Sequence, residues 1–276
     1  VYVDVTFGGG GHSREIMSRL GENGKLFAFD QDLDALKNAI DDERFTLINE
    51  NFRFIKRFLR FHGIKQVDGI LADLGVSSHQ FDVAERGFST RFDAELDMRM
   101  NQKGDISAYH VVNEYDEQDI ARVLFDYGEL KNARAMANVI VTARKDKEIR
   151  NSDELKKVLA KFLPGHKSNK ILAQIYQAIR IEVNQEMDVL KEFLEQSLEI
   201  LKPGGRLSVI SYHSLEDRLV KRFVKNGMFE GEPERDFFGN FEVPFKTIEK
   251  LIVPSEEEIA INNRARSAKL RVAEKI

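Results

Sequence analysis

The chain has 276 residues, which suits one large domain or two modest ones and is enough to bury a core without disulfides. It contains no cysteine, which excludes disulfides, thiolate metal sites and a cysteine nucleophile, and which fits a reducing compartment. The formal net charge of −4 excludes a uniformly basic nucleic-acid binder, so any nucleic-acid surface has to be a local patch.

Neither a membrane segment nor a metal site is indicated. No stretch reaches the roughly 18 uninterrupted apolar residues of a membrane span, and residue 1 already lies in an apolar strand pattern rather than in a signal peptide. The histidines never form an H-x-x-x-H pair. We therefore expect a cytoplasmic protein that binds no membrane and no metal.

Strand-like and helix-like segments alternate over residues 1–75. The apolar runs predict strands at 1–5, 25–30, 45–48 and 67–73, with helices at 13–20, 32–40 and 54–61. Ser13 and Asp32 are expected to cap the first two helices. Apolar strands that alternate with helices are typical of a parallel sheet covered on both faces. We therefore predict an α/β fold with a doubly wound, mostly parallel sheet.

The alternation stops after residue 75. Residues 76–103 predict a long ordered loop, and 106–172 show helical periods only, ended by Pro164-Gly165. The α/β pattern resumes with a helix at 181–201, a turn at 202–205, a strand at 206–212, a helix at 215–224, a loop at 226–246 and a strand at 267–273. We therefore predict a first domain part at 1–104, an all-helical insertion domain at 105–175 and a second domain part at 176–276.

A run of four glycines, from Gly8 to Gly11, separates the first strand from the first helix. Such a turn lets a ligand approach the backbone at a helix N-terminus, and Asp30, at the end of the second strand, is placed to accept both ribose hydroxyl hydrogens. A dinucleotide fingerprint needs a third glycine where Ser13 stands. The pattern therefore favours S-adenosylmethionine, although a tight turn and, for His12, a capping role are the simpler readings.

Two further segments follow strands and open towards the same sheet edge. Asp73 ends the fourth strand, where a carboxylate can contact a sulfonium ligand, accept a proton from a reacting amine or cap the next turn. His213 follows the strand at 206–212 and is expected to point into the same crevice as Asp73. No G-x-S-x-G elbow is present, and Ser214 as an N-cap with Asp217 three residues later is an adequate alternative for part of this segment.

Two basic clusters are candidates for phosphate contact with RNA. Arg53, Arg57 and Arg60 are expected on one helical face with no acid among residues 51–61, and a second cluster lies at 262–271. The competing interpretation is a solvated basic face of an amphipathic helix.

The motifs together resemble the bacterial 16S rRNA cytosine-N4 methyltransferase family, RsmH, also called MraW. The segments that carry the resemblance run in order over essentially the whole chain: DVTFGGGGHS (4–13), DGILADLGVSS (68–78), ERGFS (85–89), LDMRM (96–100), QAIRIEVNQE (177–186), LKPGGRLSVISYHSLEDR (201–218) and NRARSAKLR (263–271). The resemblance implies a Rossmann-like class I methyltransferase domain interrupted by a helical domain. It also implies S-adenosylmethionine as methyl donor and a cytosine near the ribosomal decoding centre as target.

The resemblance also implies site residues and three departures. The cofactor residues implied by the motifs and the glycine turn are Gly8, Gly10, Gly11, His12, Asp30, Phe52, Asp73 and Gln80. The family usually has Pro at the position of His79, Phe at that of Tyr212 and a different run at 168–172. Chains of the family begin upstream of Val1, so we expect an N-terminal segment to be missing.

The chemistry expected of such an enzyme leaves the acceptor of the amine hydrogens open. Many amino-methyltransferases use an acidic or amide residue followed by Pro-Pro-aromatic, and here Asp73 is followed by Leu-Gly-Val. Asp73 is therefore our hypothesis for the catalytic acceptor, with Ser77 and His213 as rivals. Unpaired RNA bases are expected to be held by the loop at 76–103 and the helical insertion.

The partner expected from the resemblance is 16S rRNA in the small ribosomal subunit, and the chain is expected to be a monomer or homodimer. Two alternatives remain: a methyltransferase of small molecules, and a non-catalytic RNA-binding or ribosome assembly factor.

Overall fold

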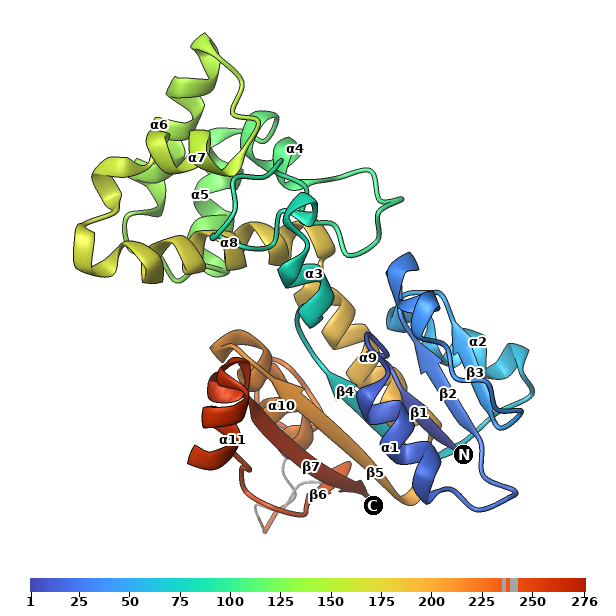
Figure 1. Ribbon diagram of the computed structural model, residues 1–276. Coiled ribbons are helices and arrows are strands. Elements are labelled where there is room, and N and C mark those ends of the chain that lie inside the picture. The colour runs from blue at the N-terminus through green and yellow to red at the C-terminus, as the bar shows by residue number, and fades with distance from the viewer. Residues whose placement is uncertain (235–236, 239–242) are drawn as a thin grey trace. The chain divides into compact units, whose positions relative to one another are not determined.

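The computed structural model describes residues 1–234, 237–238 and 243–276, and the chain divides into two compact units (Figure 1). The first unit consists of Val1–Gly75 and Met187–Ile276, and the second of Val76–Glu186. Each unit is built around its own apolar core.

The first unit contains a sheet whose described strands are β1 (Tyr2–Asp4), β2 (Leu26–Phe29), β3 (Phe45–Ile48), β4 (Val67–Asp73), β5 (Leu201–Ser211), β6 (Phe245–Thr247) and β7 (Lys269–Lys275). Their order is β3-β2-β1-β4-β5-β7-β6, with the first five parallel and β7 antiparallel to both of its neighbours. This confirms the expected doubly wound, mostly parallel, Rossmann-like sheet. The strands β2 and β3 are added on one side of β1, and β4 and β5 on the other side. The direction in which successive strands are added therefore reverses at β1, and ligand crevices form beside the carboxyl ends of the strands at such a switch point.

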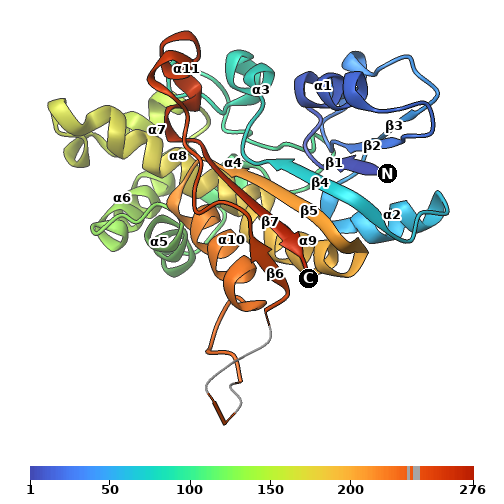
Figure 2. The ribbon, with the colours of Figure 1, turned by 90° about the horizontal axis from the view of Figure 1, so that it is seen from below.

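Helices cover both faces of this sheet (Figure 2). The elements are α1 (Gly11–Arg19), α2 (Ile55–Phe61), α9 (Glu186–Ile200), α10 (Ser214–Asn226) and α11 (Glu256–Ile261), with short 3-10 helices η1 (Leu33–Asn38), η2 (Phe52–Phe54) and η6 (Asn263–Ser267). The apolar sides of α2, α9 and α10, with Leu59, Phe193 and Phe223 among them, pack in one core with strand residues such as Val3 and Phe29. On the other face, Phe7, Ala28 and Ala35 form a smaller cluster.

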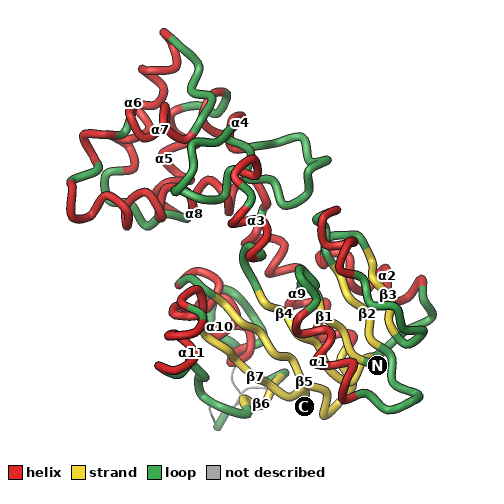
Figure 3. The backbone as a smooth tube through the Cα atoms, in the orientation of Figure 1, coloured by secondary structure: helices red, strands yellow, loops and turns green. Residues whose placement is uncertain are grey.

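The second unit consists of helices and loops with one isolated bridge between Glu95 and Asn151 (Figure 3). Its elements are α3 (Ser78–Asp82), η3 (Ala84–Arg86), α4 (Ala108–Asn113), α5 (Glu117–Asp126), α6 (Ala133–Asp146), α7 (Ser152–Val158), η4 (Ala160–Phe162), η5 (Gly165–Lys167) and α8 (Ser168–Asn184). Among the residues that the structure describes, no helix is both long and apolar enough to cross a membrane.

The unit boundaries differ from the expected 104/105 and 175/176. Position 175/176 falls inside α8, because Ile175, Tyr176 and Ile179 all belong to the core of the helical unit. The two helices separate at Gln185, whose φ of 51° is left-handed, and the unit boundary follows directly, between Glu186 and Met187. Periodicity alone does not reveal this break, since both helices are amphipathic with the same period.

Several local expectations were wrong for identifiable reasons. Ser13 does not cap α1, because Gly10 occupies the cap and Ser13 lies inside the helix. The loop predicted at 76–103 contains α3 and η3. The turn predicted at 202–205 is part of β5, which pairs with β4 on both sides of a register shift. The loop predicted at 226–246 ends in β6, and its residues 235–236 and 239–242 lie outside the described part of the chain.

Candidate active site

Three acids stand at the carboxyl ends of three adjacent strands. Asp4 ends β1, Asp73 ends β4 and Asp30 follows β2 directly. Because β2, β1 and β4 are neighbours and parallel, their carboxyl ends share one edge of the sheet. The structure therefore gathers Asp30 and Asp73, as expected, and adds Asp4, which the sequence analysis did not assign to the site.

Asp4 organises the glycine turn from within. The residue is 1% exposed. Its Oδ2 accepts a hydrogen bond from Ser13 Oγ at 2.7 Å, and its Oδ1 accepts one from Thr6 N at 3.1 Å. Burial raises the pKa of Asp4, and the bonds from Ser13 and Thr6 oppose that shift. A carboxylate at a strand end, as at Asp30 and Asp73, is the pattern that could have identified it.

Asp30 holds the other end of the same turn. Its Oδ2 accepts from Gly8 N at 2.7 Å and its Oδ1 accepts from Asp32 N at 2.8 Å. Burial raises the pKa of Asp30 to about 6, and these two backbone bonds oppose the shift. Each carboxylate oxygen can accept a second hydrogen bond, so Asp30 can still receive two hydroxyl groups.

The glycine turn combines required glycines with open space. Gly8 and Gly10 have φ values of 49° and 76°, in the left-handed region that residues with a Cβ atom rarely adopt. Apart from its chain neighbours and the backbone of its own helix, a Cβ atom at Gly9 or Gly11 would meet no heavy atom of the described residues within 4 Å. The backbone at Gly9 and Gly11 therefore borders open space, and Asp30 lies beside the same turn through its bond from Gly8 N.

Phe52 is the residue that the resemblance implies for contact with the adenine of the cofactor. It opens η2 after β3, is half-buried, and packs edge to face with Phe193 at 5.3 Å between ring centroids. The preceding Asn51 donates from Nδ2 to Gln31 Oε1 at 2.9 Å, which ties the loop after β3 to the loop after β2. Phe52 and Asp30 thus follow neighbouring strands of the sheet.

Asp73 is held on both its backbone and its side chain. Its N–H donates to Thr6 Oγ1 at 2.7 Å, and its Oδ1 accepts from the Tyr212 hydroxyl at 2.9 Å. Its Oδ2 lies 3.7 Å from His12 Nδ1. Burial raises the pKa of Asp73, while Tyr212 and His12 act in the opposite direction. His12, the second residue of α1, is therefore beside the candidate acceptor.

His213 is engaged at the start of α10. It is the N-cap, because its Nδ1 accepts from Glu216 N at 3.4 Å while Glu216 Oε2 accepts from His213 N at 3.3 Å. Its Nε2 lies 3.2 Å from Glu216 Oε1. The N-cap of α10 is therefore His213, one residue before Ser214, which the alternative reading took as the N-cap. Asp217 instead accepts from Arg271 Nε at 2.7 Å.

Ser77 and Gln80 form a reciprocal cap in the helical unit. Ser77 Oγ accepts from Gln80 N at 3.2 Å, and Gln80 Oε1 accepts from Ser77 N at 3.0 Å. This capping box starts α3 and explains why residues 76–103 are not one loop. Ser77 therefore has a structural task that is independent of any reaction.

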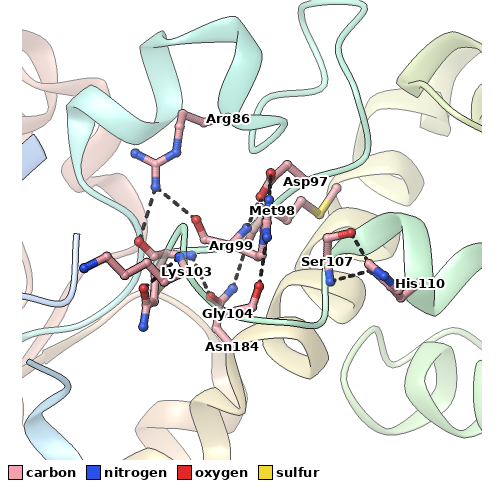
Figure 4. Close-up of polar contacts among 11 residues, drawn as sticks. Arg86, Asp97, Met98, Arg99, Lys103, Gly104, Ser107, His110 and Asn184 are labelled. Carbon is pink, nitrogen blue, oxygen red and sulfur yellow. Dashed lines mark hydrogen bonds and ion pairs between the residues drawn. The ribbon is translucent and has the colours of Figure 1, made fainter. Parts of the chain in front are cut away.

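Three motifs of the resemblance come together inside the helical unit (Figure 4). Arg86, from ERGFS, donates to the carbonyl oxygens of Arg99 and Met100, at 3.0 and 3.3 Å. Asn184, from QAIRIEVNQE, donates to Met98 O and accepts from Met100 N, at 2.8 and 2.7 Å. Met98 is fully buried with a φ of 58°. Such a strained residue persists only where its surroundings determine it, and here the bonds from Arg86 and Asn184 hold the backbone around Met98.

The expected basic face on α2 is only partly exposed. Arg53 lies in η2 rather than in α2, and its Nε donates to Glu192 Oε2 at 2.9 Å, while Lys56 pairs with Glu199. Arg57 and Arg60 remain exposed. In the second cluster, Lys269 and Arg271 both pair with Asp217, and Arg264 and Arg266 are exposed.

Known proteins resemble this chain over its full length. The family model described as the MraW methylase family matches residues 1–276. This chain belongs to the MraW methylase family. A protein of Flavobacterium johnsoniae named ribosomal RNA small subunit methyltransferase H is 82% identical, with 100% of this chain and 91% of that protein covered. A protein of the same name from Bacteroides thetaiotaomicron is 56% identical, with 99% and 90% covered.

The likeness of this MraW family member to solved structures is weaker. An rRNA methylase from Streptococcus thermophilus aligns with a TM-score of 0.43 and 13% identity, covering 100% of this chain and 86% of that one. The strand order and the family membership together define the Rossmann-like fold.

Proposed function

We propose that this member of the MraW methylase family transfers a methyl group from S-adenosylmethionine to the exocyclic N4 of a cytosine in 16S rRNA, near the decoding centre. The observation that carries the proposal is the arrangement of Asp4, Asp30 and Asp73 around a glycine turn with open space beside it. The relatives named as methyltransferases of small-subunit ribosomal RNA support the class of substrate.

The chain's residues fit the cofactor. Asp30 would receive the ribose hydroxyls, Gly10 and Gly11 with His12 would border the amino-acid end, and Phe52 would lie by the adenine. Asp4 would hold the turn in shape through Ser13 and Thr6. When bound, S-adenosylmethionine supplies an electrophilic methyl group on a sulfonium. Gly8 and Gln80 stay predicted contacts.

Asp73 is our candidate for the group that accepts the amine hydrogens. The amine of cytosine is a poor nucleophile because its lone pair is delocalised into the ring, so positive charge develops on nitrogen as it attacks. A nearby carboxylate stabilises that charge and can take the proton. Of the three candidates, only Asp73 offers a carboxyl group, which can bear negative charge opposite the amine, whereas Ser77 and His213 have capping tasks.

The RNA contacts, the cellular location and the oligomeric state are also proposals. Arg57, Arg60, Arg264 and Arg266 are exposed cations that could contact phosphates. Residues 76–103 and the helical insertion are our candidates for holding unpaired bases. From a substrate in the small ribosomal subunit we infer that the enzyme acts in the cytoplasm. The oligomeric state, monomer or homodimer, stays a prediction.

The deciding experiment is incubation with labelled S-adenosylmethionine and small subunits that lack the modification, followed by nucleoside analysis. We expect label in N4-methylcytidine of 16S rRNA. Label in another nucleoside would contradict the target atom. Cofactor binding with no label in rRNA would favour the small-molecule alternative, and absence of cofactor binding would favour the assembly-factor alternative. Free 16S rRNA tested in parallel shows whether the assembled subunit is needed.

A further inference from the structure

Tyr212 follows β5 directly and contacts Asp73 through its hydroxyl group. The phenol donates to Asp73 Oδ1 at 2.9 Å, and the residue is partly buried. The second carboxylate oxygen, Oδ2, faces His12 Nδ1 at 3.7 Å, beyond hydrogen-bond distance. The two oxygens of one carboxylate are thus in different surroundings.

We propose that Tyr212 is a positioning residue, which fixes one oxygen of Asp73 and leaves the other to face the reacting amine. The inference rests on the proposed function, because it needs Asp73 to act on the target amine. It concerns the residue at which this chain departs from the Phe that the resembled family usually has.

The hydroxyl group of Tyr212 can be removed without changing the other contacts that hold Asp73 and the Tyr212 ring. Asp73 N is already held by Thr6 Oγ1 at 2.7 Å, so the strand end does not depend on Tyr212. The Tyr212 ring packs near Gly75, where a Cβ atom would lie 3.6 Å from Tyr212 Cδ2. A phenylalanine would keep this ring contact and remove the hydrogen bond to Asp73.

The charges around the pair set the direction of the effect. Burial is the largest cause that raises the pKa of Asp73, the Tyr212 bond and His12 lower it, and the charges of Asp4 and Glu216 raise it. Burial and the charge of Asp73 raise the pKa of Tyr212, and Glu216 and Glu258 add to this. The phenol therefore stays protonated and acts as a donor, which favours the ionised carboxylate.

The test is Tyr212→Phe, with single-turnover methylation measured against pH at saturating cofactor and rRNA. Without the hydroxyl, the carboxylate loses a donor, so its pKa rises and the acidic limb of the rate profile moves to higher pH by about one unit. Tyr2→Phe is the matched control. Tyr2 lies at the amino-terminal end of β1, whereas Asp73 lies at the carboxyl end of β4, and Tyr2 is 41% exposed.

A second measurement is independent of turnover. The titration of the Asp73 carboxyl, followed by carbon NMR and assigned with Asp73→Asn, should show a higher midpoint in Tyr212→Phe than in wild type. An unchanged midpoint, or a rate lowered equally at every pH, would overturn the proposal. A wild-type chain that methylates no rRNA contradicts the proposed function, whereas a normal wild-type rate with an unmoved acidic limb contradicts only the role of Tyr212.

Discussion

The Ser13 hydroxyl in α1 donates to the Asp4 carboxylate at the end of β1, with 2.7 Å between Oγ and Oδ2. The two residues flank the glycine turn, and both are buried, at 0% and 1% exposure. The bond therefore links the end of β1 to the first turn of α1 and fixes the direction in which α1 leaves the sheet.

Ser13→Ala should destabilise the chain by about 1–3 kcal/mol, because it leaves a buried carboxylate oxygen without its donor. The free energy of unfolding is measured by urea denaturation. Ser18→Ala is the control on the same helix, since the exposed Ser18 hydroxyl donates to Glu15 O in the preceding turn rather than to a buried group. Equal stability of the two variants would show that the bond does not hold the turn.

Asp30 should make cofactor affinity depend on pH. Its pKa is raised to about 6 by burial, and the ionised carboxylate is the form that accepts ribose hydroxyls. Below pH 6 a proton must be released on binding, so affinity should fall by up to about tenfold per pH unit and level off above 6. Calorimetry across this range checks the slope.

Asp30→Asn should bind the cofactor more weakly and without this slope, because the amide does not titrate. Glu22→Gln, at an exposed acid between α1 and β2, should keep the wild-type dependence. A wild-type chain whose affinity is level from pH 5 to 7 would remove Asp30 from the ribose contact.

Asp73→Asn should chiefly lower turnover, on the scale of 100- to 10,000-fold that general-base catalysis contributes. The amide keeps the size and one acceptor oxygen but loses the charge opposite the developing cation. Cofactor and RNA affinities should change far less, since they do not depend on that charge. A near-normal single-turnover rate at saturating substrates would move the role to Ser77 or His213.

Arg57→Ala combined with Arg60→Ala should weaken RNA binding and reduce the slope of log affinity against log salt by about 0.7 to 0.9 per lost phosphate contact. Arg53→Ala should instead lower stability, because Arg53 is bonded to Glu192. Binding titrations at several salt concentrations separate the two effects. An unchanged salt slope in the double variant would show that the basic face of α2 is solvated and does not contact RNA.

Ser77→Ala should destabilise α3 by about 1 kcal/mol through loss of the capping box. Ser77→Asn keeps an N-cap acceptor and should restore the stability. If Ser77 only caps, methylation by the asparagine variant stays close to wild type. A large rate loss in both variants, with stability restored in one, would give Ser77 a role in the chemistry.

The sequence by itself determined the sheet, the glycine turn and two of the three acids around it. Strand residues such as Phe27 and Ile70 are apolar because both faces of a parallel sheet are covered, and that pattern is local in the chain. Asp30 and Asp73 could be predicted together because parallel strands bring their carboxyl ends to one edge. The same reasoning applied to Asp4 would have added it to the site.

Only the tertiary structure decided which polar groups are already engaged. Arg53 meets Glu192, and Tyr212 meets Asp73, across 139 residues of chain in each case. Likewise, Asn184 holds the backbone of Met98 from another element. Such pairs depend on where elements pack rather than on the spacing of residues within an element. A helical period shows which face a cation lies on, but the partner that neutralises it is set by the neighbouring helix or strand.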